Sequence, residues 1–452
     1  MALTDLRGNP LGTNSAPARD AVERALWRMM SFYDPPLDDL DRAIAEDPGW
    51  ALPHTMVAGY LCSLTEPGLR ADAELHLRQA QDLAEGAPAR ERLHLEAVQR
   101  LFAGRWHEAC RLWDESLLER PRDALALQWA QLWDFHRGDA FGLRGRPARA
   151  LPEWDEADPL FPHVLALHAF GLEENNQHAQ AEEAARRALA LDPRAPWAVH
   201  TVAHVMEMQG RFDDGAAWLR QHQPVWAEGN GFAGHLWWHM ALFRLEGLDD
   251  AGAMRLADTH LAGAALHITL QRLDAAALLW RLHLHGLDVA SRCRELLATW
   301  APDLDHAGQH AFNDLHVVLA CLGAGDVARA EAWTARCAER VMAADDLGRS
   351  NHAVAREVAL PLMRALLALA RGEANAAARG LYAVRPQLQR LGGSHAQRDF
   401  VDQSLLAAAA QTGHAEARAM GRALVNERCL AKPVTPLTRR WAERLGVVLG
   451  GG

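Results

Sequence analysis

The sequence predicts an all-α fold in which short pairs of helices repeat along the chain. Apolar residues recur at helical spacing throughout the 452 residues, without a useful length of strand-like alternation. Turn signals such as Gly-Asp, Gly-Arg and Asp-Pro interrupt these segments. A helical pair cannot bury its apolar face alone, so successive pairs are expected to stack on one another.

The spacing of the turns narrows the class of fold. Gly104 and Gly138 are 34 residues apart, and so are Asn176 and Gly210. Small residues recur at the same spacing, where the two helices of a pair should cross. A 34-residue period with this pattern is typical of tetratricopeptide repeats. The sequence therefore predicts a right-handed, tetratricopeptide-like helical-repeat solenoid.

The predicted organisation has three parts. Residues 1–20 are expected to be a flexible N-terminal segment, residues 21–445 one solenoid of about ten helical pairs, and residues 446–452 a flexible tail. Residues 140–159, rich in glycine and proline, are predicted to be an irregular insertion. The pair Gly392-Gly393 should end one helix, and Ser394 should cap the next as part of a capping box.

Composition limits the cellular setting and the partners. The net charge of −11 repels a phosphate backbone, so we expect no nucleic-acid partner. No window approaches the roughly 20 apolar residues of a membrane span, and the N-terminus lacks the apolar core of a signal peptide. The six cysteines form no C-x-x-C pair, which predicts reduced thiols in a cytoplasmic protein. The oligomeric state is not set by the sequence.

Two successive predicted helices carry an unusual group of polar and aromatic residues: His200, His204, Glu207, His235, Trp238 and His239. The first three follow one another at i, i+4 and i+7 and therefore share one stripe of a helix. In the tetratricopeptide register that stripe faces the concave groove. Since titratable clusters in a cleft usually mark a functional site, the histidines and Glu207 are predicted to be catalytic and Trp238 to bind ligand.

The chemistry of this group has two interpretations. Neutral histidines act as general acids and bases near pH 7, with a carboxylate such as Glu207 orienting the ring. Two histidines on each of two neighbouring helices could also hold a divalent metal. The order H-x3-H-x2-E differs from the H-E-x-x-H of zinc proteases, so we favour acid/base chemistry and expect no cofactor. A divalent metal at the histidines stays open as an alternative.

Several motifs together resemble the tetratricopeptide repeat protein 38 family. They lie at residues 198–207, 235–239, 312–316, 392–399 and 432–438. The resemblance covers roughly residues 20–440 and implies an all-helical repeat fold, but it supplies no reaction. It favours an inward position for the motif that contains His395, Arg398 and Asp399, which are predicted to bind ligand. Asp314 and His316 are added to the predicted catalytic residues because polar side chains cluster on their helix.

Two functions from different classes follow. The first is a protein whose groove binds a small polar ligand, acting as an enzyme through histidine acid/base chemistry. The second is a non-catalytic scaffold that binds a peptide or protein. Peptide-binding grooves clamp a carboxylate or backbone, whereas His, Glu, Asp and Trp favour a small-molecule site.

Overall fold

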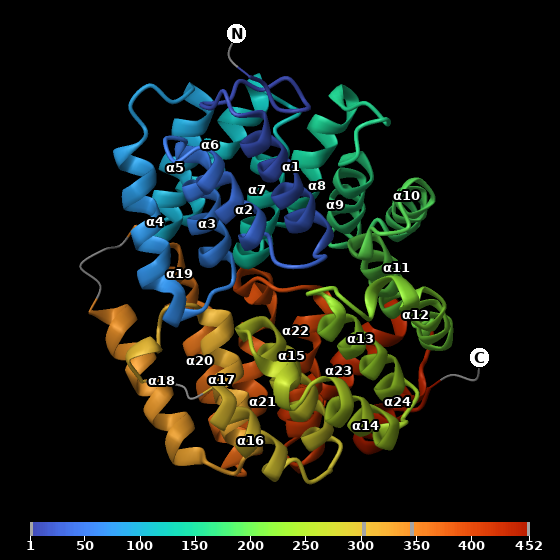
Figure 1. Cartoon of the computed structure of the whole chain (residues 1–452). Helices are drawn as coiled ribbons and strands as arrows, with labels where there is room; N and C mark the ends of the chain where they lie inside the picture. The colour runs from blue at the N-terminus through green and yellow to red at the C-terminus, as the bar shows by residue number, and fades with distance from the viewer. Residues whose placement is uncertain (1–2, 301–303, 344–347, 450–452) are drawn as a thin grey trace. The chain divides into compact units, whose positions relative to one another are not determined.

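The structure, a computed structural model, describes residues 3–300, 304–343 and 348–449. Over these residues the chain is helical throughout, with two isolated bridges and no strand (Figure 1). The predicted all-α helical-repeat class is therefore confirmed. None of the described helices combines the length and apolar character needed to cross a bilayer.

The chain forms two compact units. The first comprises residues 1–202, 224–233 and 348–350, and the second comprises residues 203–223, 234–347 and 351–452. We describe each unit by itself, and a single continuous solenoid over residues 21–445 stays a prediction.

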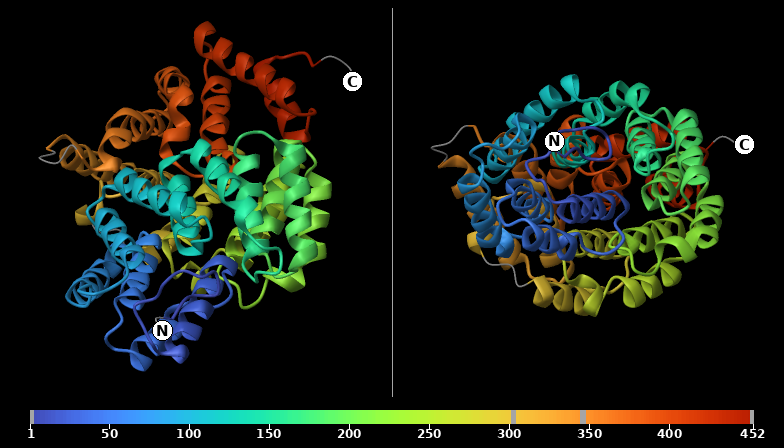
Figure 2. Two further views of the ribbon diagram at one scale, coloured as in Figure 1. Left: turned by 90° about the horizontal axis from the view of Figure 1, so that it is seen from above. Right: turned by 45° about the horizontal axis from the view of Figure 1, so that its top comes forward.

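The first unit consists of helical pairs that follow one another along the chain. Its helices are α1 (Ala16–Ser31), α2 (Leu37–Glu46), α3 (Ala51–Ser63), α4 (Arg70–Asp82), α5 (Ala89–Phe102), α6 (Trp106–Glu119), α7 (Ala124–Arg137), α8 (Ala140–Ala150), α9 (Phe161–Glu173), α10 (His178–Leu191) and the first half of α11 (Pro196–Met208). From α3 to α10, neighbours in the chain are also neighbours in space (Figure 2). This arrangement is the stacking expected of repeats.

The second unit continues the pattern from the second half of α11. Its longer helices are α12 (Phe212–Trp226), α13 (Ala233–Glu246), α14 (Asp250–His260), α15 (Thr269–Leu284), α16 (Ala290–Trp300), α17 (Ala311–Gly323), α18 (Val327–Met342), α20 (Leu360–Ala370), α21 (Ala374–Val384), α22 (His395–Ala410), α23 (Ala415–Ala431) and α24 (Pro436–Leu445). The short α19 (Ser350–Val354) precedes a single turn of π-helix at 355–359. Ser394 and Gln397 form the predicted capping box at the start of α22.

The 34-residue period has a backbone cause. Gly104, Gly138, Asn176 and Gly210 end helices in the left-handed region, with φ of 79°, 68°, 59° and 69°. Glycine, and asparagine to a lesser degree, adopts this region at little cost. The regular spacing therefore marks the turn between the two helices of each pair.

A correction concerns residues 140–159, predicted to be irregular. The structure has helix α8 there, begun by Asp139, whose Oδ1 accepts a hydrogen bond from Gly142 N at 2.9 Å. A Cβ on Gly142 would lie 2.5 Å from Asp134 Oδ2 on α7. The glycine thus permits close packing of two helices and does not break one.

The segment before α1, predicted to be flexible, is held against the first unit. Arg7 is 7% exposed and pairs with Glu23, and it lies 3.8 Å from Asp158. Gly12 N donates to Glu91 Oε1 at 2.8 Å. These buried polar contacts fix residues 3–15, while residues 1–2 of the predicted segment and 450–452 of the predicted tail lie outside the described part.

Helices α8 and α9 cross closely enough to exclude a methyl group at Gly171. A Cβ on Gly171 would lie 2.3 Å from Leu143 O and 2.5 Å from Arg144 Cα, which are both backbone atoms. Gly171→Ala is therefore expected to lower the free energy of unfolding by about 1–3 kcal/mol, as overpacking usually does. Urea unfolding followed by circular dichroism measures this.

The matched control is Gly145→Ala on α8. Its Cβ would meet only side-chain atoms at 3.5 Å or more. Alanine is a better helix former than glycine by about 1 kcal/mol, so this variant should be as stable as the wild type or more so. Equal destabilisation by both substitutions would contradict the close crossing.

In the second unit, α15 packs against α17 and against α22, which lies far along the chain. Trp280 Nε1 donates to Ser404 Oγ at 2.9 Å, and Arg281 Nη2 donates to Ala396 O at 2.7 Å. These buried hydrogen bonds bring the first turns of α22 to α15, and thereby position the candidate site.

Candidate functional site

The centre of the candidate site is formed by three histidines of the second unit. His204 belongs to α11, and His235 and His239 belong to α13, one turn apart on the same face. His204 and His239 are completely buried. Both helices have apolar neighbours on either side of these residues, so the helices are held by packing while the imidazoles meet between them.

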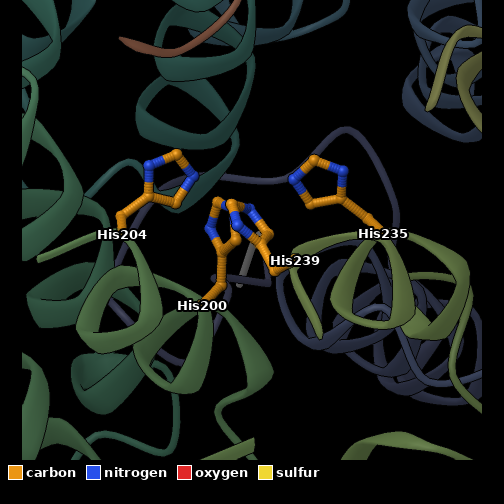
Figure 3. Close-up of side chains that lie close together, drawn as sticks. All are labelled: His200, His204, His235 and His239. Carbon is orange, nitrogen blue, oxygen red and sulfur yellow. The ribbon is translucent and has the colours of Figure 1, made fainter. Parts of the chain in front are cut away.

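The three rings contact one another. The ring centroids of His204 and His239 are 4.5 Å apart, and those of His235 and His239 are 4.8 Å apart. One nitrogen of each ring lies within 4.8 Å of the others. Figure 3 shows the rings of His204 and His235 on either side of His239. We call His204, His235 and His239 the histidine centre.

Two carboxylates contact the Nδ1 atoms of two of these rings. Glu207 Oε2 lies 3.1 Å from Nδ1 of His239, and Asp274 Oδ2 lies 2.8 Å from Nδ1 of His235. Asp274 also accepts from Gln397 Nε2 at 3.4 Å. Each carboxylate therefore fixes the orientation of one imidazole, because a bound Nδ1 leaves the ring little freedom to flip.

Burial decides the protonation of the centre. It lowers the pKa of His204 well below the usual value, and the neighbouring His235, His395 and Arg398 lower that pKa further. Burial likewise lowers the pKa of His239 and raises the pKa of Glu207 to about 8, despite the opposing effect of Lys432. Near neutral pH burial therefore favours the uncharged form of each of these two groups.

His200 lies one turn before His204 on α11, at the end of the first unit. Within that unit its ring packs among three aromatic rings, with centroids 5.5 Å from Phe170, 5.0 Å from Trp197 and 4.8 Å from Phe232. Its surroundings within the first unit are therefore aromatic, and a catalytic role of His200 stays a prediction.

The late motif at the start of α22 lies near the histidine centre. His395 and Arg398 are close enough to His204 to act on its charge. Arg398 Nη2 lies 3.3 Å from His395 Nδ1, and its Nη1 donates to Gly393 O. The contact of α15 with α22 explains why residues so far apart in the sequence meet here.

Trp238 borders the centre, whereas His316 packs against other side chains. The Trp238 ring stacks on His235 with centroids 5.2 Å apart, and Arg281 lies over the same ring. His316 is buried between Phe312 and Phe400, and its Nδ1 donates to Phe312 O at 2.8 Å. A role in ligand binding or catalysis stays a prediction for both side chains.

Asp314 requires a correction. Its carboxylate accepts from Gly308 N at 3.0 Å and from Trp333 Nε1 at 3.1 Å, on the side of α17 that faces α18. Asp314 and His316 are two positions apart in the helix, which turns the two side chains to different faces. Asp314 therefore stabilises the turn before α17, and burial raises its pKa to about 7.

Asp399 forms an ion pair with Arg428. Its Oδ1 lies 2.5 Å from Arg428 Nη1, and its Oδ2 accepts from Gln403 Nε2 at 2.7 Å. The Arg428 guanidinium holds the pKa of this carboxyl well below its usual range, against the effect of burial. The predicted ligand contact of Asp399 is thus replaced by a structural contact between α22 and α23.

Sequence reasoning missed Asp274 and Arg281 on α15. Both are buried, at 3% and 1% exposure, in a helix whose neighbouring positions are apolar. They are seven residues apart and so share one stripe. A pair of opposite charges within an apolar helical run was the signal that could have identified them.

The fold and the centre define a class: an all-α helical-repeat protein with a buried histidine centre. No family model matches the chain. Among solved structures, a tetratricopeptide repeat protein from Parabacteroides merdae is 14% identical, with a TM-score of 0.34 over 65% of this chain and 99% of that one. The human IFIT1 dimer with m7Gppp-AAAA is also 14% identical, with a TM-score of 0.41 over 96% of this chain and 95% of that one.

The second match corrects one prediction. The human IFIT1 structure contains a capped RNA, m7Gppp-AAAA. The exclusion of nucleic acid, which we based on the net charge of −11, was therefore wrong as a rule for helical-repeat chains. Net charge averages over the whole surface and does not describe a local binding site.

Proposed function

We propose that this chain is a helical-repeat protein that binds a small polar ligand at the histidine centre of its second unit. The observation that carries the proposal is the convergence of His204, His235 and His239 in the protein interior, with Arg398 beside them. Three imidazole rings in contact bring several nitrogen atoms, each able to donate or accept a hydrogen bond, to one place between α11 and α13.

The groups around the centre fit a polar ligand and not an apolar one. The imidazoles and Arg398 offer hydrogen bonds, and Trp238 offers an aromatic wall that already stacks on His235. Glu207 and Asp274 keep two of the rings in fixed orientations. Such preorganisation lowers the entropic cost of binding. Binding, rather than turnover, is the part of the predicted function that this geometry supports.

A thermal-shift experiment tests the proposal with a defined panel of glutamate, citrate, inorganic phosphate and glucose 6-phosphate. At a concentration of about 100 times Kd a ligand stabilises by about 2.7 kcal/mol, which is a Tm shift of roughly 5 °C. We expect at least one compound to shift the wild type by this amount and to leave His204→Ala unshifted.

The control variant is His414→Ala, since His414 is exposed at the start of α23. It should respond to the panel as the wild type does, and circular dichroism should show that both variants keep their helices. If the panel stabilises His204→Ala as much as the wild type, or stabilises neither, the scaffold alternative is the better one.

A further inference from the structure

The arrangement behind the histidine rings suggests what the centre holds. His235 and His239 each present Nδ1 to a carboxylate on another helix, Asp274 at 2.8 Å and Glu207 at 3.1 Å. The two nitrogens of an imidazole lie on opposite sides of the ring, so Nε2 is directed away from the carboxylate. A histidine that binds a metal almost always donates its other ring N–H to a carboxylate, carbonyl or water.

The distances within the centre suit one common ion. Zinc binds imidazole nitrogen at about 2.0–2.1 Å in a tetrahedral arrangement, so two ligand nitrogens of one ion lie about 3.4 Å apart. The three rings already have nitrogens within 4.8 Å of one another. These nitrogens therefore need to approach one another by at most about 1.4 Å, a distance that side-chain rotation can cover.

The chemistry of the donors selects the kind of ion. Imidazole ligands suit zinc, copper, iron and nickel, whereas magnesium and calcium prefer oxygen ligands. Three neutral imidazoles also leave coordination positions for water or a further ligand, as in catalytic zinc sites.

We infer that His204, His235 and His239 bind one divalent transition-metal ion of the zinc class, with Asp274 and Glu207 orienting the rings. The inference rests on the proposed function, because it names the species through which the small polar ligand binds. It reverses the preference for metal-free acid/base chemistry, since an imidazole bound to a metal cannot also act as the base. The reason for this change is the contact of Asp274 and Glu207 with the histidine rings. The sequence pattern had not predicted the contact of Asp274.

Cobalt(II) is the probe for the test, because its visible absorption reports histidine ligands directly. The full chain, with no affinity tag, is stripped by a chelator, dialysed and titrated with Co²⁺, and bound metal is counted by mass spectrometry. We expect one Co²⁺ per chain for the wild type. His239→Ala should bind at least 100-fold more weakly, and the exposed His414→Ala should bind like the wild type.

The variant Asp274→Asn tests the orienting role without altering a ligand. It keeps the shape of the side chain and should weaken Co²⁺ binding 10- to 100-fold, as losses behind a metal ligand usually do. Its melting without metal should match that of the stripped wild type. Unchanged Co²⁺ binding by both His239→Ala and Asp274→Asn, or no binding by the stripped wild type, would overturn the inference.

The thermal-shift panel, repeated on stripped and Co²⁺-loaded protein, separates the two proposals. If a panel compound stabilises the stripped wild type and His204→Ala abolishes that effect, while no Co²⁺ is bound, the metal inference fails and the proposed function stands. If Co²⁺ binds one per chain with the expected losses but no panel compound stabilises either form, the proposed function fails and the metal centre stands.

Discussion

Asp123→Ala is expected to lower the free energy of unfolding by about 3–5 kcal/mol, the usual cost of breaking a buried ion pair. Asp123 is fully buried in the first unit, and its two carboxylate oxygens accept from Arg90 at 2.8 Å each. They also contact His94 Nε2 at 2.9 Å and Ser116 Oγ at 3.1 Å, and one caps α7 at Ala126 N. The substitution leaves the Arg90 guanidinium buried without its counter-charge.

Urea unfolding at pH 7 measures the effect, and Asp20→Ala provides the control. Asp20 pairs with Arg19 on the surface of the same unit, at 2.7 Å and with 54% of its side chain exposed. Surface pairs contribute little, so this variant should change stability by less than about 1 kcal/mol. The interpretation fails if Asp123→Ala is as stable as Asp20→Ala.

The fold could be predicted because its signals are local. Left-handed turn residues 34 positions apart and helical spacing between the turns are properties of short segments, so the pairs Gly104–Gly138 and Asn176–Gly210 identified the repeat before any contact was known. The same local reasoning failed at α8. There Gly142 is needed for contact with Asp134 on α7, which is a property of packing that a turn signal does not contain.

The site was predicted only as far as single helices define it. The stripe of His200, His204 and Glu207, and the pair His235 and His239, follow from helical geometry. Asp274 belongs to the centre only because α15 lies beside α13, and Arg398 only because α22 packs against α15.

The sequence pattern also could not predict which neighbouring helix each polar side chain contacts. His316 and Asp314 are two residues apart and turn to different partners, and Asp399 meets Arg428 from another helix. No spacing rule decides which of these contacts forms, because each depends on which helices become neighbours.

Acidification from pH 6.5 to pH 4.5 is expected to remove the contribution that two buried neutral histidines make to the free energy of unfolding. Burial lowers the pKa of His136 in the first unit and of His316 in the second to about 4 each. In the unfolded chain a histidine has a pKa of about 6.5. Between these values the unfolded state binds more protons than the folded state. The stabilising contribution of each histidine is therefore fully present above pH 6.5 and is lost as the pH falls toward 4.

Each such histidine contributes a slope of up to about 1.4 kcal/mol per pH unit in this window. Urea unfolding at pH 7.0, 6.0, 5.0 and 4.5 measures the slope for the wild type, His136→Gln and His316→Gln. In each of these two variants the free energy of unfolding should depend less on pH, by up to about 1.4 kcal/mol per pH unit, because glutamine does not titrate. The control His414→Gln, at an exposed position, should keep the wild-type slope. Slopes for His136→Gln and His316→Gln that equal the wild-type slope would show that these rings are protonated in the folded state, and that burial does not keep them neutral.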